Sequence, residues 1–365
     1  MKILKFILVS IIIGFIILLE LFDFNLGLTI ANFGTFAIAV GLTLMQIIGG
    51  IIALSVGAEF VVRSSSNLAN IYKVSGYFIG FTIVALGTSL PELASTIQAI
   101  DIDSIEIALG NIIGSNIANI LLILGVVAII HPIILSKKTP AYNVLIITIG
   151  VFFILYYMLN LDKLFQISSA IFLVIILFIY LYWQYKIEKR KSEVPKDKID
   201  PSIEQFSQIL SYILLFIGIL LLVFGSRYFV IGSKNLAGYF KISEAVIGVT
   251  LVAFGTSMPE LATGILAAAK KQTGIAVGTI LGSNIYNIVG ILAVILFLKS
   301  GEIGILKPAL VINYIIMIFV TFIFVLKIKI NSNILGESSV LNLKTGIFFI
   351  VLYILYIIYN YFYTI

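Results

Sequence analysis

The strongest constraint on the fold is a series of eleven apolar stretches, each about as long as a helix that crosses a bilayer. Inside a membrane every backbone polar group must be bonded within the protein, so such stretches are expected to be α-helices. Of the 365 residues, 61% are hydrophobic and 11% are charged, which leaves too little polar surface for a soluble domain. The sequence therefore predicts an all-α polytopic membrane protein. The stretches run approximately over residues 3–22, 37–62, 77–100, 105–130, 141–159, 164–186, 207–231, 244–268, 273–298, 305–326 and 342–363.

The residue types that are missing narrow the function. The chain has no cysteine and a single histidine, His131, so thiolate nucleophiles, disulfides and histidine metal clusters are excluded. An intramembrane serine protease would have to use His131, which stands beside Pro132 at a helix end and is expected to be structural. Because the basic residues lie mostly in short breaks between apolar stretches, no nucleic-acid partner is predicted. Neither an enzymatic activity nor a cofactor is expected.

Basic residues also predict the orientation in the membrane. With a cytoplasmic amino terminus, 17 of the 23 Lys and Arg residues face the cytoplasm, as the positive-inside rule requires. We therefore expect a multi-pass protein of the cell membrane with its N-terminus in the cytoplasm. The first stretch follows Lys2 and Lys5 as a signal peptide would, but no small-residue cleavage site follows it, so a retained helix is favoured.

An internal repeat divides the chain into two halves. Residues 80–94 (GFTIVALGTSLPELA) and 248–262 (GVTLVAFGTSMPELA) are identical at 11 of 15 positions, with an offset of 168. Residues 110–119 (GNIIGSNIAN) and 278–287 (GTILGSNIYN) are identical at 7 of 10 positions with the same offset. Equivalent points are separated by five crossings, an odd number, so the second copy enters the membrane from the opposite side. Inverted repeats of this kind are typical of secondary transporters, which bind substrate near the midplane.

The expected organisation follows from this repeat. It consists of an extra N-terminal transmembrane helix with its connection (1–36), a first five-helix repeat (37–187), a cytoplasmic linker (188–206) and a second, inverted five-helix repeat (207–365). The linker contains Lys189, Arg190 and Lys191, for which contact with anionic lipid is the alternative interpretation.

Each repeat places one carboxylate deep in an apolar stretch, Glu92 in the first and Glu260 in the second. A charge at such a depth costs about 2.5–3.5 kcal/mol or more, so these acids are candidates for function. The alternative is an acid neutralised by a proton or by a structural cation, but the repeat motifs contain no Lys or Arg. Pro91 and Pro259 precede the acids and are expected to break the helices and expose backbone carbonyls.

Oxygen atoms are expected to gather beside these acids. On a helix, Ala85 and Thr88 share a face with Glu92, and the same spacing recurs in the second repeat. In the segment 110–119 a polar stripe runs through Asn111, Ser115 and Asn119. The glycines of this segment and of its equivalent, 278–287, are expected to serve helix packing. The neighbouring Asn116 and Asn284 lie off the stripe and are expected to bond the backbone instead. Carboxylate, carbonyl, amide and hydroxyl oxygens together suit calcium, and the same oxygens can be shared among sodium ions.

The paired motifs, GTSLPEL with GSNIAN and GTSMPEL with GSNIYN, resemble the alpha repeats of the sodium/calcium exchanger family, prokaryotic type, within the cation/calcium antiporter superfamily. The resemblance covers roughly residues 37–363 and implies a ten-helix core that exchanges sodium for calcium across the membrane. Sodium ions, calcium ions and membrane lipid are the expected partners, and no obligatory protein partner is predicted. It also implies the ion ligands. They are Glu92, Glu260, Thr88, Ser89, Thr256, Ser257, Ser115, Ser283, Asn119, Asn287 and the carbonyls of Ala85 and Ala253.

The sequence departs from this family pattern at Asn287, where many members carry an acid that potassium-dependent relatives associate with potassium. The absence of an acid at this position argues against potassium dependence and leaves the ratio of sodium to calcium ions open. The alternative functions are a calcium/proton or other cation/proton antiporter and, less favoured, a cation channel, which would need a continuous pore. In an antiporter, helices 37–62 and 207–231 are expected to slide against the ion-binding bundle, because they hold few site residues.

Overall fold

The computed structural model describes residues 33–101, 104–136, 141–158, 163–191, 207–239, 253–303, 308–335 and 338–363. The predicted first helix (3–22), most of the predicted linker (188–206) and the start of the second repeat motif lie outside the described residues. Every predicted span from residue 37 onward contains a described helix. Eight of the described helices are long and apolar enough to cross a membrane. The prediction of an all-α polytopic membrane protein is therefore confirmed.

The helices of the two repeats follow one another in the same order. The first repeat contains α2 (Phe33–Ile71), α3 (Gly76–Ile79), α4 (Ala85–Thr88), α5 (Leu90–Asp101), α6 (Ile105–Ala118), α7 (Leu124–Ile130), α8 (Ala141–Met158) and α9 (Lys163–Lys191). The second contains α10 (Gln208–Tyr239), α12 (Ala253–Thr256), α13 (Met258–Ala269), α14 (Thr273–Ile285), α15 (Leu292–Leu298), α16 (Pro308–Leu335) and α17 (Leu343–Tyr363). π-Helical turns at Gly80–Val84, Asn119–Ile123 and Tyr286–Ile291 join α3 to α4, α6 to α7 and α14 to α15.

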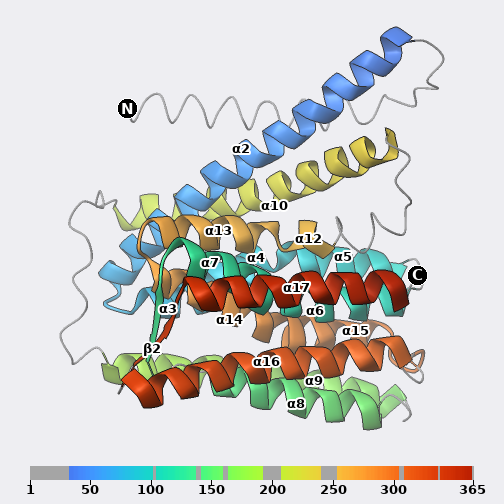
Figure 1. The fold of residues 1–365 in the computed structure, drawn as a ribbon. Helices are drawn as coiled ribbons and strands as arrows, with labels where there is room; N and C mark the ends of the chain where they lie inside the picture. The colour runs from blue at the N-terminus through green and yellow to red at the C-terminus, as the bar shows by residue number, and fades with distance from the viewer. Residues whose placement is uncertain are drawn as a thin grey trace.

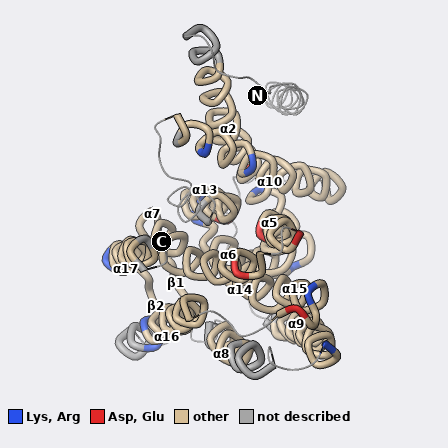
Figure 2. Tube along the Cα trace, turned by 90° about the vertical axis from the view of Figure 1, so that its right-hand side faces the viewer, with Lys and Arg blue, Asp and Glu red and all other residues tan. Residues whose placement is uncertain are grey.

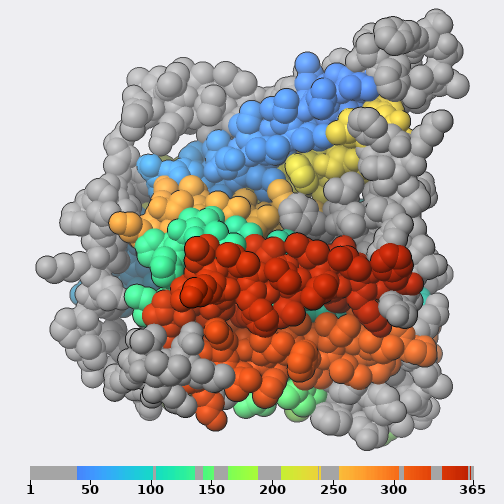
Figure 3. Space-filling model, viewed as in Figure 1, coloured from blue at the N-terminus to red at the C-terminus, as the bar shows by residue number. Residues whose placement is uncertain are grey.

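The helices form layers. Figure 1 shows α2 and α10 along one side of the bundle and α8, α9 and α16 on the opposite side. Seen along the helices, α5 and α13 lie next to the α2–α10 pair, and α6 and α14 occupy the centre (Figure 2). Burial agrees with this order, because 83% of the apolar stretch of α14–α15 is buried but only 22% of that of α17. α17 covers the middle of the face seen in Figure 3. Its exposed side chains include Phe348 and Ile354, which suit contact with lipid.

Two glycine contacts hold α2 and α10 together. A methyl group added at Gly50 would lie 2.7 Å from the carbonyl oxygen of Gly225, and one at Gly57 would lie 2.8 Å from that of Gly218. The offset of 168 exchanges these two contacts, so the pseudo-twofold axis passes between them. Such close backbone contact requires residues without side chains. The α2–α10 pair is therefore packed too tightly for its two helices to separate easily.

Both helices of this pair are longer than predicted. The predicted spans end at residues 62 and 231, but α2 continues to Ile71 and α10 to Tyr239. Arg63 gave the impression of a break, yet its side chain pairs with Glu59 one turn earlier on the same helix. The serines that follow, from Ser64 to Ser66, are buried against the bundle. Polar residues thus mark a packed helix end here rather than a loop.

A short two-stranded sheet was not predicted. β1 (Ile133–Ser136) follows α7 and pairs antiparallel with β2 (Ser338–Leu341), which precedes α17. Ile133 faces Leu341 in this register, and both side chains are fully buried, whereas Ile134 between the buried positions is 68% exposed. The alternation is typical of a strand, but four residues are too few for it to stand out in an apolar sequence.

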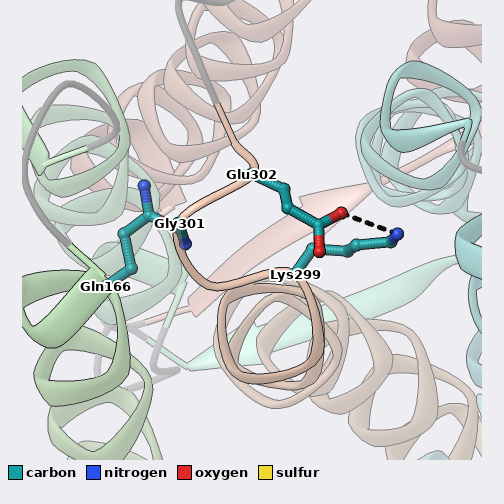
Figure 4. Close-up of polar contacts among 4 residues, drawn as sticks. All are labelled: Gln166, Lys299, Gly301 and Glu302. Carbon is teal, nitrogen blue, oxygen red and sulfur yellow. Dashed lines mark hydrogen bonds and ion pairs between the residues drawn. The ribbon is translucent and has the colours of Figure 1, made fainter.

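A side-chain amide makes a similar connection between the repeats, at the loop that follows α15. Gln166, near the start of α9, is buried. Its Nε2 donates to the carbonyl of Ile303 at 3.1 Å and its Oε1 accepts the Gly301 N–H at 2.7 Å. Gly301 has a φ of +86°, which suits glycine. In the same loop an ion pair at 2.8 Å joins Lys299 to Glu302 (Figure 4). This loop follows α15 as β1 follows α7. Both connections therefore join the first repeat to the second.

Candidate ion-binding site

Matched helix breaks position the two buried acids. α4 ends at Thr88 and α5 begins at Leu90, so Ser89 lies in the break; Ser257 lies in the same way between α12 and α13. A proline stands just after each break. A continuous helix would need a backbone N–H at that position, and proline has none. Glu92 and Glu260 stand in the first turns of α5 and α13. Helix N-termini favour negative charge, so both breaks stabilise a carboxylate inside the bundle.

The acids of the two repeats meet at one place. Glu92 and Glu260 are both fully buried. Ser89 Oγ donates to Glu260 Oε1 at 3.5 Å, and Ser257 Oγ donates to Glu92 Oε1 at 3.4 Å. Each serine in a helix break therefore bonds the acid of the opposite repeat, and the four residues form one crossed, pseudo-symmetric cluster.

Further oxygens lie beside Glu260. Ser283 Oγ, on α14, donates to Glu260 Oε1 at 3.0 Å and lies 3.4 Å from both Thr88 Oγ1 and the carbonyl oxygen of Ala85. The Ala85 carbonyl thus belongs to the cluster, but not because Pro91 frees it. It accepts the Ser89 N–H at 3.0 Å, and the proline removes the donor to the residue four positions earlier, which is Gly87.

Several buried oxygens of the two acids and of the polar residues on α6–α7 and α14–α15 have no hydrogen-bond partner among the described residues, and these atoms point to a ligand. They are Glu92 Oε2, Glu260 Oε2, Ser115 Oγ, Asn119 Oδ1, Asn287 Oδ1 and Thr279 Oγ1. Buried polar atoms are normally bonded, so an unpaired group of this size needs an explanation. Carboxylate, hydroxyl and amide oxygens without a nitrogen or sulfur ligand match the preference of calcium and other hard cations.

Comparisons with known proteins show to which family the chain belongs. The sequence model of the family described as "Sodium/calcium exchanger protein" matches residues 42–186 and 210–362. The chain belongs to the sodium/calcium exchanger family. It is 40% identical over 245 residues to an uncharacterized membrane protein of Methanocaldococcus jannaschii, which covers 67% of this chain and 78% of that protein.

Two proteins named as sodium/calcium exchangers are similar to this chain over most of their length. The sodium/calcium exchanger MaX1 of Methanosarcina acetivorans is 29% identical over 294 residues, covering 71% of this chain and 81% of MaX1. A solved structure of the sodium-calcium exchanger NCX_Mj, soaked with Na+ and Sr2+, superposes with a TM-score of 0.69 at 32% identity, covering 87% of this chain and 97% of that one. The fold of the exchanger family, with its inverted repeats, is therefore the fold of this chain.

Not all sequence-predicted residues of this exchanger are joined by hydrogen bonds. Ser115 and Asn287 are fully buried, but their side-chain oxygens have no hydrogen-bond partner in the part of the chain that the structure describes. Asn119 and Asn287 both lie in π-helical turns, which often occur at functional sites. Ala253 begins α12 at the position equivalent to Ala85.

Two asparagines outside the predicted ligand set bond residues of that set, namely Asn284, which was expected to bond its backbone, and Asn111, which was predicted only as part of a polar stripe. Asn119 Nδ2 donates to Asn284 Oδ1 at 2.9 Å, so Asn284 links the two repeats rather than bonding its own backbone. Asn111 Nδ2 donates to the backbone carbonyl of Glu92 at 3.1 Å, and its Oδ1 accepts the Thr256 hydroxyl at 3.4 Å. The GSN motif gave no signal that separates Asn284 from Asn116, which does bond its backbone, at the carbonyl of Ile112.

The predicted glycine packing is confirmed for the second repeat. A methyl group at Gly278 would lie 2.2 Å from the Tyr77 carbonyl oxygen, and one at Gly282 would lie 2.4 Å from that of Phe81. For Gly110, the equivalent of Gly278, no such contact exists within the described part of the chain, and Gly110 is partly exposed. The two repeats therefore pack unequally around the cluster.

Proposed function

We propose that this protein is a secondary antiporter that exchanges sodium for calcium across the cell membrane by alternating access. The observation that carries the proposal is the crossed cluster in which the two buried carboxylates, Glu92 and Glu260, each bond a serine of the opposite repeat and each keep one oxygen without a partner among the described residues. Two carboxylates balance the charge of one calcium ion, which takes six to eight oxygen ligands. The exchanger relatives MaX1 and NCX_Mj support the same assignment.

The proposed ligands come equally from the two repeats. Each repeat contributes one acid, the two hydroxyls before it, a serine and an asparagine from the following span, and one backbone carbonyl. The set is Glu92, Thr88, Ser89, Ser115, Asn119 and Ala85 from the first repeat, and Glu260, Thr256, Ser257, Ser283, Asn287 and Ala253 from the second. When calcium leaves, the same oxygens serve sodium ions, so the two cations compete for one site.

Alternating access is supported by the lack of proposed ion ligands on the α2–α10 pair. Neither helix contributes a proposed ligand, and their glycine contacts hold them together as one unit. We propose that this unit slides against the bundle formed by the remaining helices of the repeats 37–187 and 207–365. The excess of basic residues supports a cytoplasmic N-terminus and a cytoplasmic linker over 188–206, with residues 1–36 as an additional helix and connection.

Calcium binding to the purified protein tests the site separately from transport. Calcium-45 bound at equilibrium is expected to fall as sodium is added, and Glu260→Gln is expected to lower calcium affinity at least tenfold, since a buried charged ligand is lost. Glu302→Gln is the matched control, because Glu302 is an exposed carboxylate paired with Lys299 outside the cluster. Equal calcium binding by Glu260→Gln and Glu302→Gln would refute the site.

A further inference from the structure

A buried serine of α10 bonds the backbone of the second helix break. Ser226 Oγ donates to the carbonyl oxygen of Gly255 on α12 at 2.5 Å, and both residues are buried. The two helices are in contact and lie side by side in the bundle (Figure 1). A serine inside a helix commonly donates to a carbonyl of its own preceding turn. Donation to another helix therefore indicates that the Gly255 carbonyl is available as an acceptor.

Pro259 explains why this carbonyl is available. In a continuous α-helix, the Gly255 carbonyl would accept the backbone N–H of the residue four positions later, which is residue 259. Proline has no N–H, so the helix supplies no donor at that position. A buried carbonyl without a donor is costly, and the interior of a membrane offers no bulk water to bond it. The Ser226 hydroxyl thus takes the place of the missing N–H.

Close packing of α10 on the break is a second, independent observation. Val230 lies one turn after Ser226 on the same face of α10. A methyl group added at Gly255 would lie 1.9 Å from Val230 Cγ2. The absence of a side chain at Gly255 therefore allows this face of α10 to come close enough for Ser226 to reach the carbonyl.

The bonded peptide group is part of the proposed ion site. The Gly255 carbonyl belongs to the peptide group that joins Gly255 to Thr256, and Ser257 follows directly. Ser257 Oγ donates to Glu92 Oε1 at 3.4 Å, so the position of this backbone sets how the second repeat meets the acid of the first. Groups that bond and orient ion ligands without touching the ion commonly affect its affinity.

The first repeat has no equivalent of this serine. The offset of 168 places Gly87 and Pro91 at the positions of Gly255 and Pro259, but it places Ala58 at the position of Ser226. Alanine has no side-chain donor. Ser226 is therefore specific to the second break, and the comparison of the repeats gives no sign of it.

We propose that Ser226 is a positioning residue of the ion-binding site. Its hydroxyl completes the backbone bonding that Pro259 leaves open and so holds the Thr256 and Ser257 oxygens in place for the cation. Ser226 acts through the peptide group between Gly255 and Thr256 and is not itself a ligand. The proposal rests on the proposed function and adds a residue of α10, a helix outside the proposed ligand set.

Two substitutions that differ only in the hydroxyl test this role. Ser226→Thr keeps the donor, whereas Ser226→Val has the same shape without it. Calcium-45 binding at equilibrium to the purified protein is expected to be about fivefold weaker in Ser226→Val than in Ser226→Thr, as for the loss of one buried hydrogen bond. Ser211→Val is the matched control. Ser211 is a buried serine of α10 that accepts from Asn67 Nδ2 at 2.7 Å, so this variant also loses a buried bond but is expected to keep its calcium affinity.

A second background tests whether Ser226 acts through the Gly255 carbonyl. Pro259→Ala returns a backbone N–H to the position that can bond this carbonyl, so Ser226→Val and Ser226→Thr are expected to bind calcium equally in that background. Equal calcium affinities of the two variants with Pro259 present, or the same difference in both backgrounds, would overturn the proposal. Absence of sodium-sensitive calcium binding by the wild-type protein is a different outcome, which would refute the proposed function itself.

Discussion

Gly278 lies in close contact with the backbone of the first repeat, so a methyl group added there is expected to disturb the packing between the two repeats. A methyl group there would lie 2.2 Å from the carbonyl oxygen of Tyr77 and 2.8 Å from the amide nitrogen of Phe81. Both atoms belong to the backbone of the first repeat, so no flexible side chain can move aside. Gly278→Ala is therefore expected to push α14 away from the segment around the π-helical turn Gly80–Val84.

The magnitude follows from the size of this overlap. Ordinary van der Waals contact begins near 3.4 Å, so the two backbones must separate by about 1 Å. Overpacking of this kind costs about 1–3 kcal/mol, and replacing glycine by alanine in a helix returns about 0.5–1 kcal/mol. The net cost to the closed packing is about 1–2 kcal/mol, or roughly 5- to 30-fold in the ratio of closed to open forms.

Labelling of a cysteine beside the contact measures this opening. Thr279 is fully buried next to Gly278, so Thr279→Cys in the cysteine-free chain is expected to react slowly with a water-soluble thiol reagent. Adding Gly278→Ala is expected to raise the rate about 5- to 30-fold. Gly150→Ala is the matched control, because Gly150 is exposed and no heavy atom of the described chain lies within 4 Å of its added methyl group. An equal labelling rate in the two variants would refute the packing argument.

Three other substitutions give distinct outcomes. Glu92→Gln is expected to abolish sodium/calcium exchange while the protein still elutes as a folded species, and calcium flux in that variant would contradict the role of the acid. Asn287→Asp adds a third carboxylate to the cluster and is expected to change the sodium stoichiometry or introduce potassium dependence; flux assays that show neither would refute the interpretation of this position. Gln166→Leu leaves the Gly301 N–H and the Ile303 carbonyl unpaired and is expected to destabilise the protein by about 2–4 kcal/mol, so an unchanged thermal unfolding temperature would show that this connection is unimportant.

The sequence was sufficient for the parts of the fold that depend on long patterns. Spans of about 20 apolar residues and a gapless repeat at an offset of 168 identify the helices and their inversion. The ends of α2 and α10 escaped prediction because buried polar residues such as Ser64 look like a loop. The β1–β2 pair escaped because its strands are four residues long and their partners lie in different repeats.

The sequence predicted only part of the candidate site. Glu92 and Glu260 stand out because an acid in an apolar span is costly, and the structure brings their repeats together through crossed serine bonds. Asn284 was misjudged because helical periodicity describes one helix at a time. Its bond to Asn119 depends on how α14 packs against the first repeat, which no local pattern specifies.

Calcium-45 uptake into proteoliposomes tests the central claim most directly. Vesicles loaded with sodium are compared with potassium-loaded vesicles and with vesicles that carry an imposed pH gradient, each with wild-type protein and with Glu92→Gln. Uptake by wild-type protein only against a sodium gradient, and none by Glu92→Gln, is the expected result. Uptake that follows the pH gradient and ignores sodium would contradict sodium/calcium exchange and make the two acids proton carriers.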